Sequence, residues 1–324
     1  MTTLVTGATG LVGNNLVRLL LETGEAVRVL VRKNCDPRPL AGLNVELAMG
    51  DVCDIDSVRR AVDGVSQVVH SAAQVHIGWT GLESQRAVNV EGTRNVAQAA
   101  RDAKARMVHV SSVDALGVGS PEILADEDSP RAGKVPCSYV ISKRESEQIF
   151  LAEVSKGLEG VVVSPGFMLG PWDWKPSSGR MLLEVTRRFT PFAPKGGCSV
   201  SDVRDVAAGI LAALERGATG RLYILGGENV TYLELWKRIC AITGGSAPVC
   251  RAGPLMRIIA GRGGDVVGKL TGREPDVNSA AVGMSDLYHY YSIARAQAEL
   301  GYVVRPMDES ISAAWEWFQA EGYV

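Results

Sequence analysis

The chain has 324 residues, of which 46% are apolar and 22% are charged, and its formal net charge is −2. This length and apolar content are enough for a sizeable core and two lobes. A nearly neutral chain offers no electrostatic argument for binding nucleic acid or an anionic membrane. The six cysteines and four histidines show no metal-ligand or disulfide-scaffold spacing. The first strand follows Met1 without room for a signal peptide, and no apolar run is long enough to span a membrane, so we expect a cytoplasmic protein.

A glycine-rich turn follows the first predicted strand, Leu4-Val5, and leads into a helix predicted over 11–21. In such a turn the first glycine, Gly7, permits a tight bend and the second, Gly10, lets the backbone approach a pyrophosphate. The third, Gly13, lets the helix pack closely on the strand. A second strand over 26–31 completes a βαβ unit, which favours dinucleotide binding over a simple tight turn. The cofactor contacts expected here come from Gly7, Thr9, Gly10, Leu11 and Val12.

The second strand ends in Arg32-Lys33, where an acidic residue would accept hydrogen bonds from the adenosine ribose. A guanidinium would instead pair with a 2′-phosphate. The sequence therefore predicts NADP(H) as the preferred cofactor, with NAD(H) as the second choice. The alternative is a solvated pair of charges at a strand end.

Short apolar strands then alternate with helical patterns, which predicts a doubly wound parallel sheet with ligands at the carboxyl ends of its strands. The further strands are predicted over 45–49, 67–70, 107–110 and 160–163.

Polar and small residues follow two of these strands. Asp51, before Val52, can accept a hydrogen bond from the adenine amino group, or it can cap a helix predicted near 54–62. Ser71, Ala72 and Ala73 would let the cofactor lie on the backbone, although close packing explains such small side chains nearly as well.

The order and spacing of several strings resemble the extended short-chain dehydrogenase/reductase family, also called the NAD-dependent epimerase/dehydratase family, over nearly the whole chain. The matching strings are those at 6–13, 50–51, 71–73, 89–93, 111–112, 139–143 and 202–207. Within the family, Arg32 and the strings at 164–171 and 300–302 are most similar to dihydroflavonol 4-reductase-like and hopanoid-associated epimerase-like members.

The resemblance implies an α/β fold in which residues 1–165 form a doubly wound parallel Rossmann domain. A segment at about 200–226 returns to this domain. Residues 166–324 otherwise form a smaller, mostly helical and discontinuous substrate lobe. The family also implies a homodimer formed through helices at about 83–103 and 138–154.

Tyr139 and Lys143 lie one turn apart on a helix predicted over 138–154, so both side chains share one face. A tyrosine has an ordinary pKa of about 10 and needs a nearby cation before it can exchange a proton near neutral pH. By resemblance Tyr139 transfers the proton, while Lys143 also bonds the nicotinamide ribose. Without the glycine turn, a chance surface pair would be the better interpretation.

A third catalytic group should hydrogen-bond the substrate oxygen. Alignment of the family on Gly117 indicates Ser112, with Ser111 as the fallback, and either could merely satisfy backbone groups at a strand end. Asn89 matches a family position that holds the central helix and an active-site water. It could equally be the N-cap of a helix over 90–100.

Two departures from the sugar-nucleotide members affect the predicted substrate. Leu116 and Ser164 replace a tyrosine and an arginine of those members, and the segment 167–169 is apolar. Since burying a diphosphate against apolar side chains is costly, we expect a small apolar carbonyl compound. The loop over 172–179 is suited to cover the substrate or the cofactor, and the alternative is plain packing of its two tryptophans. Further cofactor contacts are expected from Pro165, Gly166, Met168 and Ser178, and substrate contacts from Gln74, Val113, Phe167, Trp172 and Trp174.

The C-terminal part contains a helix predicted over 202–214, a strand over 221–225 and a docking helix over 308–320. Apolar stretches at 255–260 and 266–270 flank a basic, glycine-rich segment at 261–264, which we interpret as a flexible hinge that could serve a mobile lid. Ordinary helix packing explains these apolar stretches better than contact with a membrane surface.

The sequence thus predicts a carbonyl reductase that uses NADPH and acts without a metal, or the reverse alcohol dehydrogenase. The first alternative is an NAD-dependent sugar-nucleotide epimerase or dehydratase, against which Arg32 and Ser164 count. The second is a non-catalytic redox sensor, a class in which the tyrosine–lysine pair is usually degraded.

Overall fold

A seven-stranded, entirely parallel sheet forms the centre of the computed structural model, which describes residues 1–324. Its strand order is β10-β6-β5-β4-β1-β2-β3, which is the doubly wound order with one strand added at the edge. The strands are β1 (Thr2–Thr6), β2 (Ala26–Val31), β3 (Glu46–Met49), β4 (Gln67–His70), β5 (Arg106–Val110), β6 (Gly160–Pro165) and β10 (Leu222–Leu225). The predicted fold class is confirmed.

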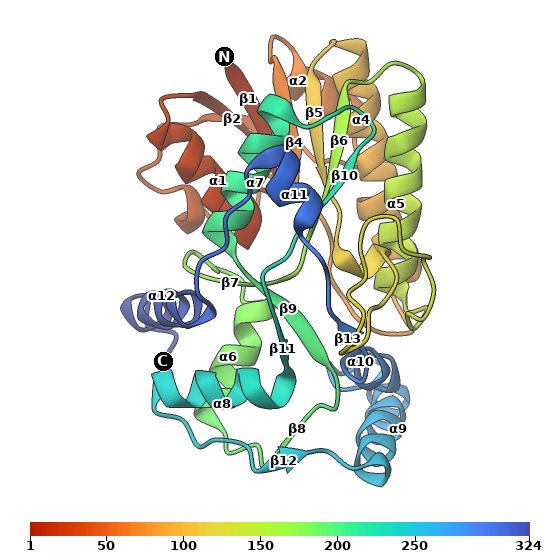
Figure 1. Ribbon diagram of the computed structural model, residues 1–324. Helices are drawn as coiled ribbons and strands as arrows, with labels where there is room; N and C mark the ends of the chain where they lie inside the picture. Colours follow the sequence, from red (N-terminus) through yellow and green to blue (C-terminus); the bar gives the residue numbers. More distant parts are fainter.

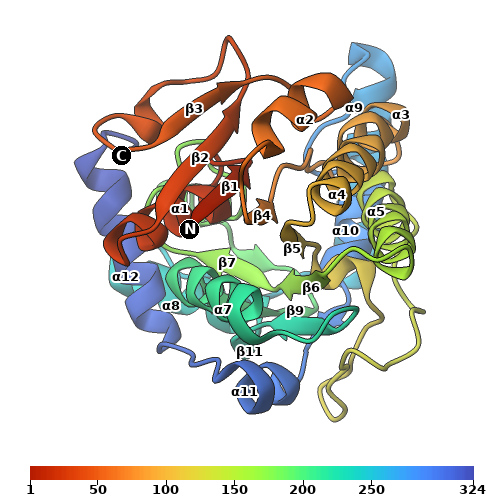
Figure 2. The same ribbon diagram turned by 90° about the horizontal axis from the view of Figure 1, so that it is seen from above.

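Helices cover both faces of this sheet (Figure 2). One face carries α1 (Leu11–Glu22), α7 (Val203–Arg216) and α11 (Ala294–Leu300). The other carries α2 (Ile55–Val62), α4 (Gly92–Asp102) and α5 (Ser138–Ser155). Because side chains alternate along a strand, Val5 points to the first layer and Leu4 to the second.

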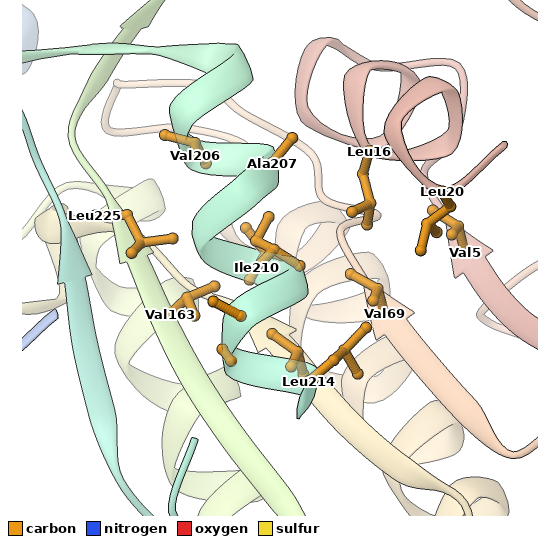
Figure 3. Packing of buried hydrophobic residues seen from close by; sticks show 14 of the residues in the cluster. Val5, Leu16, Leu20, Val69, Val163, Val206, Ala207, Ile210, Leu214 and Leu225 are labelled. Carbon is orange, nitrogen blue, oxygen red and sulfur yellow. The ribbon is translucent and has the colours of Figure 1, made fainter. Parts of the chain in front are cut away.

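The larger core cluster joins α7 to α1 and to the sheet. Figure 3 shows Ile210 and Leu214 of α7 directed toward Val163 and Val69 of the strands, with Leu16 of α1 beside them. The segment after residue 200 therefore covers the first sheet face, and β10 pairs with β6 at the edge.

The C-terminal part of the chain lies below the carboxyl edge of the large sheet (Figure 1). It contains a four-stranded sheet of β7 (Phe167–Leu169), β9 (Gly197–Asp202), β11 (Glu228–Thr231) and β13 (Tyr288–His289), and the pair β8 (Phe192–Ala193) with β12 (Cys250–Arg251). The helices are α6 (Ser178–Arg187), α8 (Tyr232–Thr243), α9 (Pro254–Thr271), α10 (Ser279–Ser285) and α12 (Met307–Ala320). This second sheet was not expected from the sequence, because most of its strands have two to four residues and the longest, β9, is a mixed polar sequence and not a continuous apolar run.

The predicted hinge at 261–264 is wrong, because α9 continues through it without a break. Glycines in this helix lie where the next segment approaches closely: a Cβ on Gly264 would stand 1.8 Å from the Val277 carbonyl oxygen, and one on Gly261 3.0 Å from the Ser279 Cα. The glycines therefore permit tight packing. None of the helices combines the length and apolar content needed to cross a membrane.

Candidate active site

The glycine turn between β1 and α1 leaves no space for side chains at two of its three glycines. Gly7 has a φ of +73°, and a Cβ there would lie 2.6 Å from the Ala72 nitrogen. A Cβ on Gly13 would lie 2.3 Å from the Gly7 carbonyl oxygen. The turn, the β4 end and the first turn of α1 are therefore in direct backbone contact.

Gly10 differs, because a Cβ there would meet only the Gly7 carbonyl oxygen, at 3.4 Å. The residue precedes Leu11 and Val12, the first residues of α1, and no side chain caps this helix. The first N–H groups of a helix have no partner within it and favour an anion. Thr9 lies in the same turn. This open, positively polarised cradle fits the pyrophosphate of a dinucleotide.

The residues after β4 lie next to this cradle. The Ser71 hydroxyl donates to the Thr6 carbonyl oxygen at 2.7 Å, which fixes the start of the segment that continues through Ala72 and Ala73. Asn89 fixes the other end of this segment at Gln74. The Asn89 Oδ1 accepts from the Gln74 N–H at 2.7 Å, and the Asn89 Nδ2 donates to the Gln74 carbonyl oxygen at 3.0 Å.

Asn89 lies inside a π-helical turn (Arg86–Glu91) between the short helix α3 (Leu82–Gln85) and α4, so the N-cap alternative is wrong. Its Nδ2 also donates to the Ser142 hydroxyl on α5 at 3.0 Å. The π-turn thus aims an amide side chain at the strand edge and at α5. Gln74 itself directs its side chain toward Ser84, 3.2 Å away.

The carboxyl end of β2 carries Arg32 and Lys33, which are exposed and form no ion pair. Asp51, after β3, accepts from the Cys53 N–H at 2.9 Å. The cap of α2 is Asp54, whose carboxylate accepts from the Asp56 N–H, so Asp51 is not the N-cap. Val52 is buried beside it.

Tyr139 and Lys143 lie one turn apart on α5 and are both buried. The Lys143 Nζ donates to the carbonyl oxygen of Val110, the last residue of β5, at 2.9 Å. This bond ties the helix to the strand edge on which the two serines follow.

The two serines have different environments. The Ser111 hydroxyl donates to the Glu147 Oε2 at 3.0 Å, and Arg131 pairs with the other oxygen of that buried carboxylate. The Ser112 hydroxyl accepts from the Asp114 N–H at 3.1 Å and lies close enough to Tyr139 to lower its pKa. Of the pair, Ser112 is the one that faces Tyr139.

Burial dominates the protonation of Tyr139. It raises the pKa of the phenol well above its ordinary value, and the Asp114 carboxylate adds to the rise while Ser112 opposes it. Burial also lowers the pKa of Lys143 to about 8, against the opposing carboxylates of Glu147 and Asp114. Tyr139 is therefore neutral near pH 7 and can donate a proton, whereas the sequence reasoning expected the cation to lower its pKa.

A buried charge cluster beside Tyr139 was missed by the sequence analysis. The Lys134 Nζ donates to the Asp114 Oδ1 at 3.1 Å and to the His289 Nδ1 at 2.5 Å, while the His289 Nε2 donates to the Met284 carbonyl oxygen at 2.9 Å. Burial and Lys134 lower the pKa of His289 to about 4, so this imidazole is neutral. Only Asp114, two residues after Ser112, could have signalled the cluster, because His289 is 155 residues from Lys134.

The loop after β6 leaves the large sheet through Pro165 and Gly166, and a Cβ on Gly166 would lie 2.5 Å from the Ser199 carbonyl oxygen. Phe167 and Met168 follow on β7, half-buried, and Ser178 begins α6. The Val113 carbonyl oxygen accepts from the Tyr291 hydroxyl at 3.1 Å.

The two tryptophans of this loop contact the first half of the chain. The Arg18 guanidinium lies 3.3 Å from the Trp172 ring centroid, and that of Arg38 lies 5.5 Å from the Trp174 centroid. Both rings also contact Trp317 of α12, at 6.1 and 5.2 Å between centroids. These contacts favour packing over the predicted substrate contact, which stays a prediction.

Comparison with known proteins agrees with this geometry. The model of the "NAD dependent epimerase/dehydratase family" matches residues 3–226. A "putative dihydroflavonol 4-reductase" of Synechocystis sp. is 37% identical, covering 99% of this chain and 95% of the relative. "Sterol demethylase protein B" of Methylococcus capsulatus is 35% identical over the whole of both chains. The crystal structure of gox2253 is 36% identical with a TM-score of 0.86, covering 99% of this chain and 98% of that one.

Proposed function

The chain belongs to the NAD-dependent epimerase/dehydratase family of extended short-chain dehydrogenases/reductases and is an oxidoreductase; on that premise we propose that it reduces a small apolar ketone or aldehyde with NADPH. The bound nicotinamide would supply the hydride. The proposal depends above all on Tyr139, which is buried, protonated at neutral pH and accompanied by Lys143 and Ser112.

In this proposal each residue has one task. Ser112 orients the carbonyl oxygen of the substrate, and Tyr139 donates the proton to that oxygen as negative charge develops on it. Lys143, fixed to the Val110 carbonyl oxygen, holds positive charge one helical turn from Tyr139 and would bond the ribose of the nicotinamide when the cofactor is bound. In the reverse direction the same tyrosine accepts the proton of an alcohol.

The preference for NADP(H) is proposed from Arg32 and Lys33, which have no carboxylate partner at the position where the 2′-phosphate is expected. The expectation of an apolar substrate depends on the half-buried Phe167 and Met168 and on the two relatives whose names indicate a flavonoid and a sterol.

Residues 1–165, with the segment at about 200–226, are proposed to bind the cofactor, and the rest of 166–324 to bind the substrate. A cytoplasmic location and a homodimer through α4 and α5 complete the proposal. Sedimentation velocity would measure whether the protein is a homodimer.

The deciding experiment titrates the purified protein with NADPH and NADH and then supplies a panel of apolar carbonyl compounds and nucleoside-diphosphate sugars. We expect tighter NADPH binding and net oxidation of NADPH by an apolar carbonyl. A protein that retains NAD and isomerises a sugar nucleotide without net redox change would instead be an epimerase.

A further inference from the structure

Helix α9 lies at the lower edge of the molecule (Figure 1). It exposes a row of apolar side chains to solvent. Leu255 is 71% exposed, Ile259 63% and Leu270 81%, and Ile258 and Val266 are also more than half exposed. Spacings of three, four and seven residues place these positions on one face of a helix. We call this row, with Ile258 and Val266 included, the outer face of α9.

The opposite face of α9 packs against the segment that follows it. Gly261 and Gly264 approach Ser279 and Val277, and a Cβ on Gly268 would lie 3.3 Å from the Pro275 side chain. The small residues thus point inward and the large apolar residues outward, which is the reverse of a helix that packs into its own protein.

The charged residues of α9 are also divided between its two faces, with unpaired basic residues on the outer face and the acidic residue bonded to the segment on the inner face. Arg262 and Lys269 lie on the outer face by spacing, Arg273 follows the helix, and none of the three forms an ion pair. The only acidic residue of α9, Asp265, accepts from the Ser279 N–H at 2.9 Å. Although the net charge of the chain is −2, the outer face of α9 is locally cationic.

This surface is connected to the proposed catalytic residue. The α9–α10 connection is anchored to the loop after β4, because Glu274 accepts from the Trp79 N–H at 2.8 Å. The next helix, α10, places Ala280 and Met284 in one apolar cluster with Tyr139. Trp79 is half exposed, and its ring N–H donates to the hydroxyl of Ser279, the first residue of α10, at 2.8 Å.

We propose that the outer face of α9 docks on the surface of a lipid bilayer that contains anionic headgroups. Arg262 and Lys269 stand among the apolar side chains of this face, and such long basic side chains can extend to anionic headgroups while the apolar residues are buried at the headgroup boundary. A symmetric contact between two copies would instead bury Arg262 and Lys269 in the interface with no free acidic side chain of α9 to pair with them, because Asp265 is bonded to Ser279. In the docked orientation α9 would lie between the membrane, where an apolar carbonyl compound would be dissolved, and α10, which packs on the inner face of α9 and clusters with Tyr139.

The test measures co-sedimentation of the purified full-length protein with phosphatidylcholine vesicles, with and without phosphatidylglycerol. We expect binding to the anionic vesicles that weakens as salt is added. The double variant Ile259→Asp/Leu270→Asp should bind more than tenfold less tightly. Arg262→Gln, Lys269→Gln and Arg273→Gln should each weaken binding about fivefold. The matched control is Ile123→Asp/Leu124→Asp, which places the same two charges at an exposed isoleucine and an exposed leucine, 73% and 45% exposed, of a loop outside α9.

Absence of vesicle binding by the wild type, or equal binding by the double variant, overturns the proposal. Self-association of the wild type that the double variant abolishes, without vesicle binding, would assign the face to a second copy. Because binding is read without turnover, an inactive reductase assay leaves this inference standing. Conversely, the double variant should reduce a water-soluble carbonyl at the wild-type rate.

Discussion

Tyr139 is the residue on which the proposed reaction depends most directly. Tyr139→Phe removes the hydroxyl but keeps the ring in its apolar cluster with Ala280 and Met284, so folding and NADPH binding should be unchanged. Loss of a positioned proton donor should lower kcat by about 100-fold to 10,000-fold. The control is Tyr223→Phe on β10, whose hydroxyl contacts Glu299 at 2.8 Å. Wild-type turnover in Tyr139→Phe would remove the tyrosine from the mechanism.

Asp114 controls the charge balance around the catalytic pair. Its carboxylate raises the pKa of Tyr139 and that of Lys143, which is about 8. Removing this negative charge therefore lowers both pKa values, and the alkaline limb of the kcat/KM profile for reduction should move to lower pH. Because Lys134 would be left buried and unpaired, we specify the double variant Asp114→Asn/Lys134→Met. Asp126→Asn, which removes an exposed carboxylate, should leave the profile in place.

Arg32 decides between the two dinucleotides in the proposed site. Arg32→Asp would replace a phosphate-pairing guanidinium by a carboxylate able to accept from ribose hydroxyls, so the ratio of NADPH to NADH affinity should fall by about tenfold to a hundredfold. Arg60→Asp, the same charge change at an exposed position on α2, is the control. Fluorescence titration with both cofactors measures the ratio, and an unchanged ratio in Arg32→Asp would end its assigned role.

At the scale of elements, α9 offers a paired test of its glycines. A Cβ on Gly264 would collide with the Val277 carbonyl oxygen, whereas one on Gly263 would meet nothing within 4 Å. Gly263→Ala should stabilise the protein by about 0.5–1 kcal/mol, because alanine loses less backbone entropy in a helix. Gly264→Ala should destabilise it by at least about 1–3 kcal/mol through the forced displacement. Urea unfolding of both variants reads the difference, and equal effects would contradict the close packing of α9.

Elements with a strong period were predictable from sequence, and those defined by tertiary contacts were not. The strands of the large sheet and α1, α5 and α7 are continuous apolar or amphipathic runs, so their positions follow from local pattern. The course of α9 through Gly261 and Gly264 depends on residues 275–279, which no local pattern reveals.

The residues of the candidate site also fall into a group that was predictable from sequence and a group that was not. Tyr139, Lys143 and the glycine turn are adjacent in sequence to the elements that position them. The Asp114–Lys134–His289 cluster is assembled from three separate segments, and its burial depends on how those segments pack. Sequence spacing could therefore indicate the proton donor but not the charges that adjust its pKa.

At the scale of the whole molecule, the part of the chain after β6 returns repeatedly to the large sheet. Helix α7 fills the same core cluster as α1, and α12 brings Trp317 against the loop of Trp172 and Trp174. Asp173 is buried within that loop and accepts from the Gly179 N–H at 3.2 Å. Its ionisation therefore bears on the stability of the contact between the two halves.

The stability of the whole molecule should carry a pH signature of Asp173. Burial raises the pKa of this carboxyl to about 6, above its unfolded value of about 3.9. The folded state then binds more protons than the unfolded state between these values, so this group makes the free energy of unfolding fall as pH rises from about 4 to 6. Two pKa units correspond to about 3 kcal/mol.

Asp173→Asn should therefore exceed the wild type in stability at pH 7 by about 1–3 kcal/mol, because its amide oxygen can still accept from Gly179 and no charge is buried. The advantage should disappear near pH 4. Buried His70 and His289, whose pKa values are lowered to about 3 and about 4, give the opposite slope in both proteins, so the difference between variant and wild type isolates Asp173. Urea unfolding of both proteins at pH 4 to 8 measures this difference in the free energy of unfolding. A difference that stays constant across this range would show that folding leaves the pKa of Asp173 unshifted, and the proposed burial effect would be wrong.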